Sequence, residues 1–356
     1  MPKELPLPTA ADLEEKLKKY KRGMQIMLEG AQAETGRTPK DVIWTKNKAK
    51  LYHYEPKVEK KFRVPILLIY ALINRPYVLD LMPGNSLVEY LVNQGFDVYM
   101  LDWGTPGDED KNISFDNYVL DYIPRAVKKM LRNSHADEYS MLGFCIGGTM
   151  TAMYASLFPE KLRNLILLTA PIDFPPDKMG LYGMWTSEKY FDPDLLADAF
   201  GNIPGELVDT GNRLVRPVTN YVGTYVTMWD RILQGKPMDN WLAMNKWVND
   251  GVPFAGAAFK QWIREFYQQN KLVKGEIKLR GQRVDLSNIS CSLLAIGGKK
   301  DHICTLPQAE PIMNLIGSED KEFYVLDAGH VGLLTGSDAK NNLWPKIRSW
   351  LEARSQ

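Results

Sequence analysis

The chemistry that this sequence suggests begins at Cys145, which has a glycine two residues away on each side. Residues 143–147 read Gly-x-Cys-x-Gly, and they lie between a predicted strand at 140–144 and a predicted helix at 148–157. A strand that turns directly into a helix strains the residue between them and leaves no room for side chains beside it. The pattern is therefore typical of a nucleophile elbow, with cysteine in place of serine. The helix dipole favours a thiolate at this point, so we predict that Cys145 is a nucleophile.

An elbow of this kind takes an acid and then a histidine from further along the chain. Of the four histidines, only His302 and His330 follow the elbow. His330 stands in an Ala-Gly-His-Val-Gly loop after the last predicted strand, where this arrangement carries its base. We predict that His330 is the general base and that His302 is a neighbour on the substrate side.

Two aspartates are candidates for the acid that orients the base. Asp301 follows the predicted strand at 291–296, and it is the residue we predict. Asp173 follows the predicted strand at 165–169 and is the alternative, because some enzymes with this arrangement place the acid there.

The oxyanion of an acyl-transfer intermediate needs backbone N–H donors close to the nucleophile. The N–H of Ile146, at the start of the helix after the elbow, is one predicted donor. The loop after the predicted strand at 65–69 is expected to supply a second, and Ile73 or Asn74 lies there.

Strands and helices alternate along the segments that carry these residues. The short apolar runs lack polar alternation, which indicates strands covered on both faces and hence a parallel sheet. We predict an α/β-hydrolase fold with a mostly parallel, doubly wound sheet. The predicted strands are 65–69, 96–101, 140–144, 165–169, 291–296 and 322–326, and the predicted helices are 86–93, 118–131 with a possible kink at Pro124, 148–157 and 342–353.

The alternation stops between residues 174 and 290, a stretch rich in aromatic residues and without a clear strand. We interpret 174–290 as a helical cap (lid) inserted into a core made of 38–173 and 291–356. Ligands of open α/β sheets bind at the carboxyl edge of the strands, so the cap is expected to cover that edge and line an apolar tunnel. The other interpretation is that these aromatic residues only form a small core of their own.

The N-terminal segment, 1–37, contains an amphipathic helical stripe preceded by a start signal, Thr9 with Asp12. One interpretation is a helix that packs on its own domain, and the other is a docking helix for a partner or a hydrophobic surface. The residues of the stripe are Leu13, Leu17, Tyr20, Met24 and Met27.

Composition excludes several classes of protein. The formal charge of +1 over 356 residues argues against a nucleic-acid binder. The longest apolar run, 64–73, is much shorter than the roughly 20 residues of a membrane span, and no secretory signal is visible. Three cysteines form no disulfide framework, which favours a reduced cytoplasmic compartment. Cys291 and Cys304 are expected to be buried and inert.

Cysteine suits one kind of acyl chemistry better than serine does. A thiolate attacks and leaves readily, and exchange of an acyl group between two thiols is close to thermoneutral. The residues therefore predict a cysteine acyltransferase or hydrolase, with neither a metal nor a resident cofactor. Transfer wins over hydrolysis only where water is kept out, and an aromatic cap suits that need.

Several segments together resemble the polyhydroxyalkanoate synthases. The short chain resembles their two-subunit type, closest to the class IV, bacillus-like catalytic subunit at 38–52 and 254–270, with class III next. The other segments that carry the resemblance are 65–81, 95–104, 143–150, 300–302 and 328–330.

The resemblance implies an acyltransferase that polymerises (R)-3-hydroxyacyl-CoA, typically 3-hydroxybutyryl-CoA, and releases CoA. Cys145 would be the nucleophile and His330 its base, while Asp301 would orient the histidine or help to activate the 3-hydroxyl. The resemblance also implies a small second subunit, a homodimer formed through the cap, and a place on polymer granules in the cytoplasm. The alternatives are a cysteine hydrolase of the thioesterase or dienelactone-hydrolase kind and a non-catalytic granule scaffold.

Overall fold

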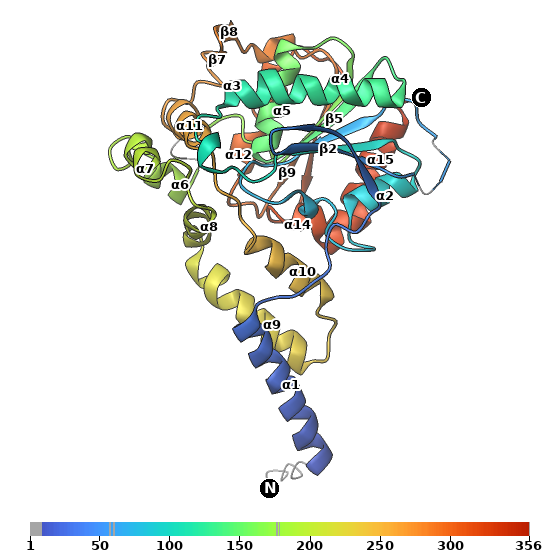
Figure 1. The fold of residues 1–356 in the computed structure, drawn as a ribbon, viewed down its shortest axis with the longest axis vertical. Helices are drawn as coiled ribbons and strands as arrows, with labels where there is room; N and C mark the ends of the chain where they lie inside the picture. Colours follow the sequence, from blue (N-terminus) through green and yellow to red (C-terminus); the bar gives the residue numbers. More distant parts are fainter. Residues whose placement is uncertain (1–8, 57, 60, 176, 178, 356) are drawn as a thin grey trace.

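The computed structural model describes residues 9–355 except 57, 60, 176 and 178, and its centre is an eight-stranded sheet in the order β1-β2-β4-β3-β5-β6-β9-β10 (Figure 1). The six strands from β4 to β10 in this order are parallel. The predicted mostly parallel sheet is confirmed. The strands are β1 (Lys40–Lys46), β2 (Ala49–Tyr54), β3 (Ile66–Ile69), β4 (Val98–Asp102), β5 (Tyr139–Phe144), β6 (Leu162–Leu168), β9 (Ser292–Gly298) and β10 (Lys321–Leu326).

Helices cover the sheet on both faces. Strands such as β3 and β5 are therefore buried along their whole length. In Figure 1, α4 and α5 lie on one face, while α2 and α15 pack together on the other. The sheet is therefore doubly wound. The bounds are α2 (Leu87–Asn93), α3 (Phe115–Asn117), α4 (Ile123–Ser134), α5 (Ile146–Leu157), α12 (Leu306–Ala309), α13 (Ile312–Leu315), α14 (Gly332–Thr335) and α15 (Trp344–Glu352).

The predicted helix at 118–131 begins with a π-helical turn, Tyr118–Tyr122, and continues as α4. Pro124 is the second residue of α4, directly after the π turn, and it lacks the N–H that would donate to a carbonyl of that turn. The irregularity lies in the π turn just before the proline.

The antiparallel hairpin of β1 and β2 was not predicted. Its strands join at a tight turn where Asn47 has a φ of 53°. β2 then pairs antiparallel with β4, which adds two strands to one edge of the parallel sheet. Strand β1 alternates irregularly because its register shifts between Val42 and Trp44, so it lacks the regular alternation of a half-buried strand.

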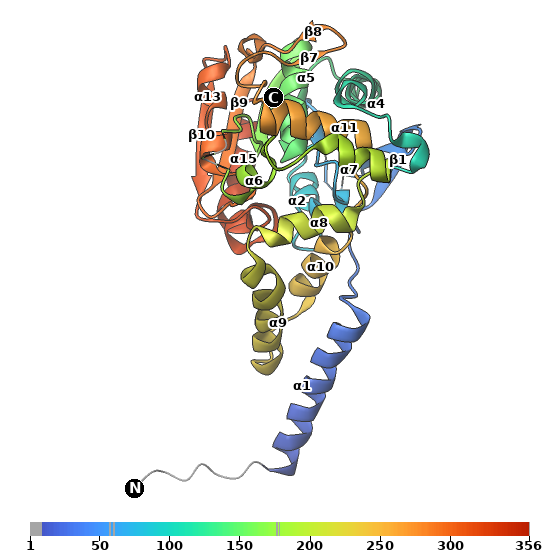
Figure 2. The ribbon, with the colours of Figure 1, turned by 90° about the vertical axis from the view of Figure 1, so that its left-hand side faces the viewer.

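The chain between β6 and β9 is mainly helical, as predicted for 174–290, but it also holds a small hairpin of two short strands. Figures 1 and 2 show α6, α7, α8 and α11 along one side of the core, with α9 projecting away from it. The bounds are α6 (Leu181–Trp185), α7 (Pro193–Phe200), α8 (Gly205–Leu214), α9 (Thr224–Leu233), α10 (Asp239–Val248), α11 (Gly256–Gln261), β7 (Lys278–Leu279) and β8 (Gln282–Arg283).

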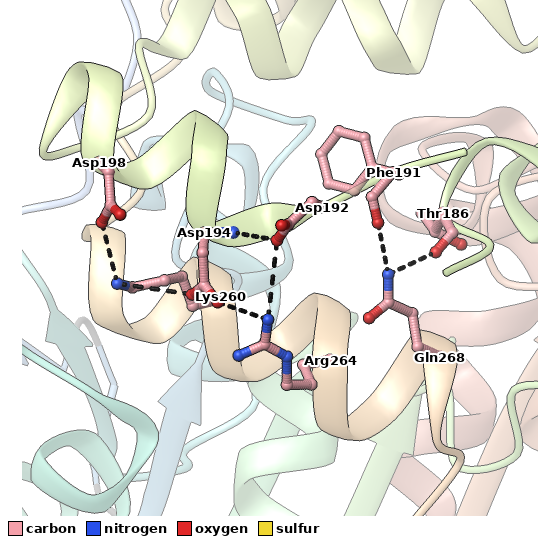
Figure 3. A network of polar contacts seen from close by, with 8 residues as sticks. All are labelled: Thr186, Phe191, Asp192, Asp194, Asp198, Lys260, Arg264 and Gln268. Atoms are coloured by element: carbon pink, nitrogen blue, oxygen red, sulfur yellow. Dashed lines mark hydrogen bonds and ion pairs between the residues drawn. The ribbon is translucent and has the colours of Figure 1, made fainter. Parts of the chain in front are cut away.

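Polar contacts fasten α7 to α11 and to the π-helical turns that follow it, Trp262–Gln268 (Figure 3). The guanidinium of Arg264 donates to Asp194 at 2.5 Å, and the Nζ of Lys260 lies 3.4 Å from Asp198. Gln268 donates through Nε2 to the backbone carbonyl oxygens of Thr186 and Phe191. These contacts join parts of the insertion that lie about 70 residues apart in sequence.

The N-terminal helix α1 (Ala10–Glu29) begins where the start signal predicted, and residues 1–8 lie outside the described part of the chain. The Thr9 N–H donates to Asp12 at 2.8 Å, and the Asp12 N–H donates to the Thr9 hydroxyl oxygen at 3.2 Å. We call α1 and α9 together the arm, because both extend beyond the core (Figures 1 and 2). No helix among the described residues has both the length and the apolarity to cross a membrane.

Candidate active site

Cys145 lies at the sharp bend between β5 and α5, with φ 55° and ψ −128°. Its neighbours must be glycines, since an added Cβ at Gly147 would lie 2.5 Å from the Tyr70 carbonyl oxygen. An added Cβ at Gly143 would lie 2.5 Å from the Cα of Gly148. Real Cβ atoms do not approach other atoms so closely, and the bend therefore holds the thiol at the N-terminus of α5 in one place.

His330 and Asp301 reach the same edge of the sheet from the loops after β10 and β9. The Nδ1 of His330 lies 2.7 Å from Oδ2 of Asp301, and both side chains are buried. The other carboxylate oxygen, Oδ1, accepts the N–H groups of Ile303 and Cys304, each at 2.9 Å. Because both oxygens are engaged, the carboxylate is fixed in orientation and in turn fixes the imidazole ring.

The charge state of His330 follows from its neighbours. Burial by itself lowers the pKa of His330, but the opposite charges of Asp301 and Cys145, with hydrogen bonds to both, raise it to about 10. The ring therefore carries its proton near neutral pH. The structure brings Cys145, His330 and Asp301 into one chain of hydrogen bonds, which is the arrangement that nucleophilic acyl transfer requires.

Two family models match the chain over these elements. Residues 64–337 match the alpha/beta hydrolase fold, and residues 13–91 match the N-terminus of poly-beta-hydroxybutyrate polymerase (PhaC). A poly(3-hydroxyalkanoate) polymerase subunit PhaC of Allochromatium vinosum is 35% identical over 344 residues, which cover 95% of each chain. The chain belongs to the PhaC family.

Other PhaC subunits show the same similarity with different overall lengths. The subunit of Haloferax mediterranei is 42% identical over 326 residues, and the match spans 92% of this chain and 66% of the relative. The subunit of Synechocystis is 35% identical, with 90% of this chain and 86% of the relative covered. This PhaC family member thus spans about two thirds of the haloarchaeal relative and most of the cyanobacterial one.

Solved structures confirm the fold of this PhaC family member at low sequence identity. A structure from work on carboxylesterases of Nitrososphaera gargenis has a TM-score of 0.52 at 15% identity, covering 88% of this chain and 98% of the other. A structure from work on the lipolytic enzymes LipS and LipT has a TM-score of 0.51 at 19% identity, and the match covers 83% of this chain and 96% of the other. Both comparisons support the α/β-hydrolase fold alone.

The alternative acid, Asp173, makes a different contact in this PhaC family member. Its Oδ1 accepts a hydrogen bond of 2.7 Å from Asn270, whose own side-chain oxygen accepts the N–H of Phe174. Asp173 thus fastens the start of the insertion to its later part. The contact with His330 is made by Asp301.

His302 lies beside the acid and is half-buried. Burial, followed by the positive charge of Arg216, lowers the pKa of His302. Its Nδ1 is buried and finds no hydrogen-bond partner among the described residues. A neutral ring with a vacant nitrogen is compatible with the predicted substrate-side neighbour, and that role stays a prediction.

The predicted oxyanion donors lie in the segments that follow two neighbouring strands, β5 and β3. Ile146 is the first residue of α5, directly after the nucleophile. Ile73 and Asn74 are partly buried in the turn after β3, and the Ile73 carbonyl accepts the N–H of Val252 at 3.2 Å. That bond anchors the turn to the insertion, while the donor roles of Ile146, Ile73 and Asn74 stay predictions.

The two remaining cysteines are poor nucleophiles in this setting. Burial raises the pKa of the Cys291 thiol to about 12, and it raises the pKa of Cys304 well above its ordinary value. Cys304 is buried as expected, whereas Cys291 is only partly buried. Neither thiol is ionised near neutral pH, in keeping with the inert role expected for both.

Two tyrosines that the sequence did not single out approach the nucleophile from the insertion. Burial raises the pKa of both Tyr182 and Tyr267, and the charge on Cys145 raises each further. Their ring centroids are 6.2 Å apart, and the Tyr182 hydroxyl donates to Asn212. The aromatic richness of 174–290 predicted rings near the site, but only the folded chain shows that Tyr182 and Tyr267 are among them.

Proposed function

We propose that this chain is the catalytic subunit of a polyhydroxyalkanoate polymerase that acts through a covalent cysteinyl thioester. The observation that carries the proposal is the hydrogen-bonded set of Cys145, His330 and Asp301 in a member of the PhaC family. The substrate that fits this chemistry is an (R)-3-hydroxyacyl-CoA, and 3-hydroxybutyryl-CoA is the form we propose.

The first step is acylation of the enzyme. The Cys145 thiolate attacks the thioester carbonyl, the C–S bond to CoA breaks, and CoA leaves as a thiolate that takes the proton from His330. The N–H of Ile146 stabilises the oxyanion between these events. In the second step, the hydroxyl of one acyl unit gives its proton to His330 and attacks the cysteinyl thioester of another, so that an ester forms and a thiolate is released.

Asp301 acts in this scheme by orienting His330. The 2.7 Å contact with Nδ1 and the two backbone N–H groups on the other oxygen support that role over activation of the 3-hydroxyl, since both carboxylate oxygens are already engaged. The scheme needs neither a metal nor a resident cofactor, because CoA arrives as part of the substrate. Both absences stay predictions.

Transfer rather than hydrolysis is supported by the cover over the nucleophile. Cys145 is only 8% exposed, and the partly buried Tyr182 and Tyr267 of the insertion lie close enough for its charge to raise the pKa of each. A covered thioester is shielded from water while the next hydroxyl is delivered. The alternative is a cysteine hydrolase with the same three residues, and the two are separated by their products.

The test supplies 3-hydroxybutyryl-CoA to the purified chain together with a small second subunit. We expect CoA release with matching formation of polyester, and no CoA release from Cys145→Ala. Free 3-hydroxybutyrate without polymer would establish the hydrolase instead. No turnover in either form would favour the non-catalytic scaffold, and near-normal CoA release from Cys145→Ala would reject the nucleophile.

We further propose the assembly in which the chain works. It would pair with a small second subunit of the class IV type in preference to class III, form a homodimer through the cap, and act at the surface of polymer granules in the cytoplasm. The subunit names of the relatives and the comparable length of the Allochromatium relative support a multi-subunit enzyme. Co-expression with a class III or a class IV second subunit, followed by co-purification, separates the two types.

A further inference from the structure

The apolar stripe on α1 is not the face by which the helix contacts its own chain. Leu13, Leu17 and Tyr20 remain 55%, 52% and 57% exposed, and Met27 remains 47% exposed. With Met24, these residues follow one another at alternating steps of four and three, which is the spacing of the contact positions in a coiled coil. We call Leu13, Leu17, Tyr20, Met24 and Met27 the seam.

The intramolecular contact of α1 uses a different face. Gly23 is buried against the ring of Trp229 on α9, and the Nζ of Lys19 donates to the Leu233 carbonyl. Ile26 packs against the apolar cluster beneath α9. One step along a helix turns it by about 100°, so a face centred on Gly23 leaves the seam beside it uncovered. The Tyr20 ring, 5.5 Å from that of Trp229, reaches both faces, and Met24 is half-buried.

We propose that the seam pairs with the seam of a second copy of this chain, as an antiparallel two-helix coiled coil. In the favoured register, Leu17 packs against Tyr20 of the partner subunit and Leu13 packs against Met24 of the partner subunit. The contact is twofold and self-complementary, as the interfaces of most homodimers are. It goes beyond the proposed function and does not depend on it.

The charges beside the seam complement those of a second copy when the two helices run antiparallel in this register. Glu14 and Lys21 border one edge of the seam, and Lys16 borders the other. In an antiparallel pair each edge faces the same edge of its partner, which sets Glu14 beside Lys21 of the partner subunit twice over. A parallel pair would set Lys16 beside Lys21 of the partner subunit, and like charges there repel.

A shift of the antiparallel register by one repeat would bring the two copies of Lys21 together, so the charges also disfavour that register. Within the single chain, Glu14 is 2.9 Å from Lys18, but both side chains are largely exposed. An exposed pair of this kind is weak, and Glu14 can exchange it for a contact across the interface.

The place of α1 in the molecule leaves room for such a pair. In Figures 1 and 2 the N-terminal part of α1 extends past α9 and past every other described element. An antiparallel pairing centred between Lys18 and Lys19 would place the two cores at opposite ends of the helix pair. The contact is therefore distinct from a cap-to-cap contact between the cores.

The test is sedimentation velocity of the full chain over a series of concentrations. We expect the wild type to associate through the seam in addition to the contact proposed through the cap, and Leu17→Glu to raise the dissociation constant of the seam step by about tenfold or more. Glu14→Lys and Lys21→Glu should each raise this dissociation constant by about threefold to tenfold. The double variant Glu14→Lys/Lys21→Glu should restore it, because the exchanged charges again face each other. Arg22→Glu changes the charge equally on the opposite side of α1 and should leave association unchanged.

Circular dichroism of each variant checks that the helix and the core remain folded, which is expected because the substituted side chains are exposed. A wild type that stays monomeric at every concentration would overturn the proposal. So would seam variants that associate as the wild type does, since the cap alone would then hold the dimer. Seam variants that lose only the binding of a second subunit or of granules would assign the seam to that occupant and likewise overturn the proposal.

Discussion

His330 keeps a proton in a position where burial alone would remove it. The opposite charges of Asp301 and Cys145 outweigh the burial and raise the pKa of the ring to about 10. The ring therefore holds a proton, which in the proposed reaction passes to the departing CoA thiolate, and the contact with Asp301 fixes the orientation of the ring. A change in Asp301 or Cys145 therefore alters the pKa of His330.

Replacement of His330 is expected to stop formation of the reactive pair. His330→Gln should lower the rate of CoA release by about 10²–10⁴, the usual effect of removing a general base. His302→Gln is the matched control, because it removes a neighbouring ring that does not contact Asp301 in this way. The measurement is CoA release under saturating substrate, and a larger loss at His302 would reverse the assignment.

The titration of the His330 ring should report both of its charged neighbours. In the wild type the ring loses its proton as the pH rises through about 10. Cys145→Ala and Asp301→Asn each remove one opposite charge, so the ring should lose its proton at a lower pH, by about one unit or more in each case. NMR of the imidazole nitrogens measures this. If the titration stayed unchanged in both variants, the charge coupling described above would be wrong.

The sequence located this unit better than it resolved its details. Cys145 and His330 followed from glycine spacing and chain order, which are local properties. The choice between Asp301 and Asp173 was open because both follow strands of the sheet, and only the folded chain shows that Asn270 engages Asp173. Tyr182 and Tyr267 were not found, because no local signal tells which rings of a helical insertion turn toward a distant strand.

At the scale of elements, the site depends on the close approach of α5 to β3. An added Cβ at Gly147 would lie 2.5 Å and 2.6 Å from the carbonyl oxygens of Tyr70 and Ile69. Those atoms belong to the backbone at the end of a buried strand and cannot swing aside. The elbow is thus held by the sheet on one side and by the first turn of α5 on the other.

Gly147→Ala is expected to destabilise the chain by about 1–3 kcal/mol through overpacking, and to lower activity by moving Cys145 and the N–H of Ile146. Gly211→Ala in α8 is the matched control, since no described atom lies within 4 Å of its added Cβ. The control should be neutral or more stable by roughly 0.5–1 kcal/mol. Urea unfolding with activity assays checks both, and equal effects would contradict the role of the close approach.

Other elements show where local pattern stops being informative. The buried parallel strands were predictable because both faces are apolar, whereas β1 is an irregular edge strand with a shifted register at Val42. The irregularity predicted at Pro124 takes the form of a π turn in the residues just before it. In both cases the backbone hydrogen bonds decide the geometry, and side-chain periodicity does not record them.

At the scale of the whole molecule, the arm is joined to the rest by a small separate core. Met228, Ile232 and Met238 are buried there, apart from the main core around the sheet. The stripe on α1 was predictable from its spacing, but its direction was not, because that depends on which face Gly23 turns to Trp229.

Gly23→Leu is expected to separate α1 from α9, since even an added Cβ would lie 2.3 Å from the ring of Trp229. Limited proteolysis should then cut within α1 at least about tenfold faster, because local opening exposes the backbone. Gln25→Leu places the same leucine side chain at an exposed position on the same helix and should leave cleavage unchanged. Cleavage of Gly23→Leu at the wild-type rate would show that the arm does not rely on this contact.

The bend at residue 145 has a consequence for how the fold tolerates change. A φ of 55° with a ψ of −128° is a conformation that glycine adopts freely and that a cysteine adopts at a cost of about 1–3 kcal/mol. The residue we propose as the nucleophile therefore lowers the stability of the fold at its own position. Glycine there would release the strain and remove the thiol, so the proposed chemistry and the greatest heat resistance make opposite demands on residue 145.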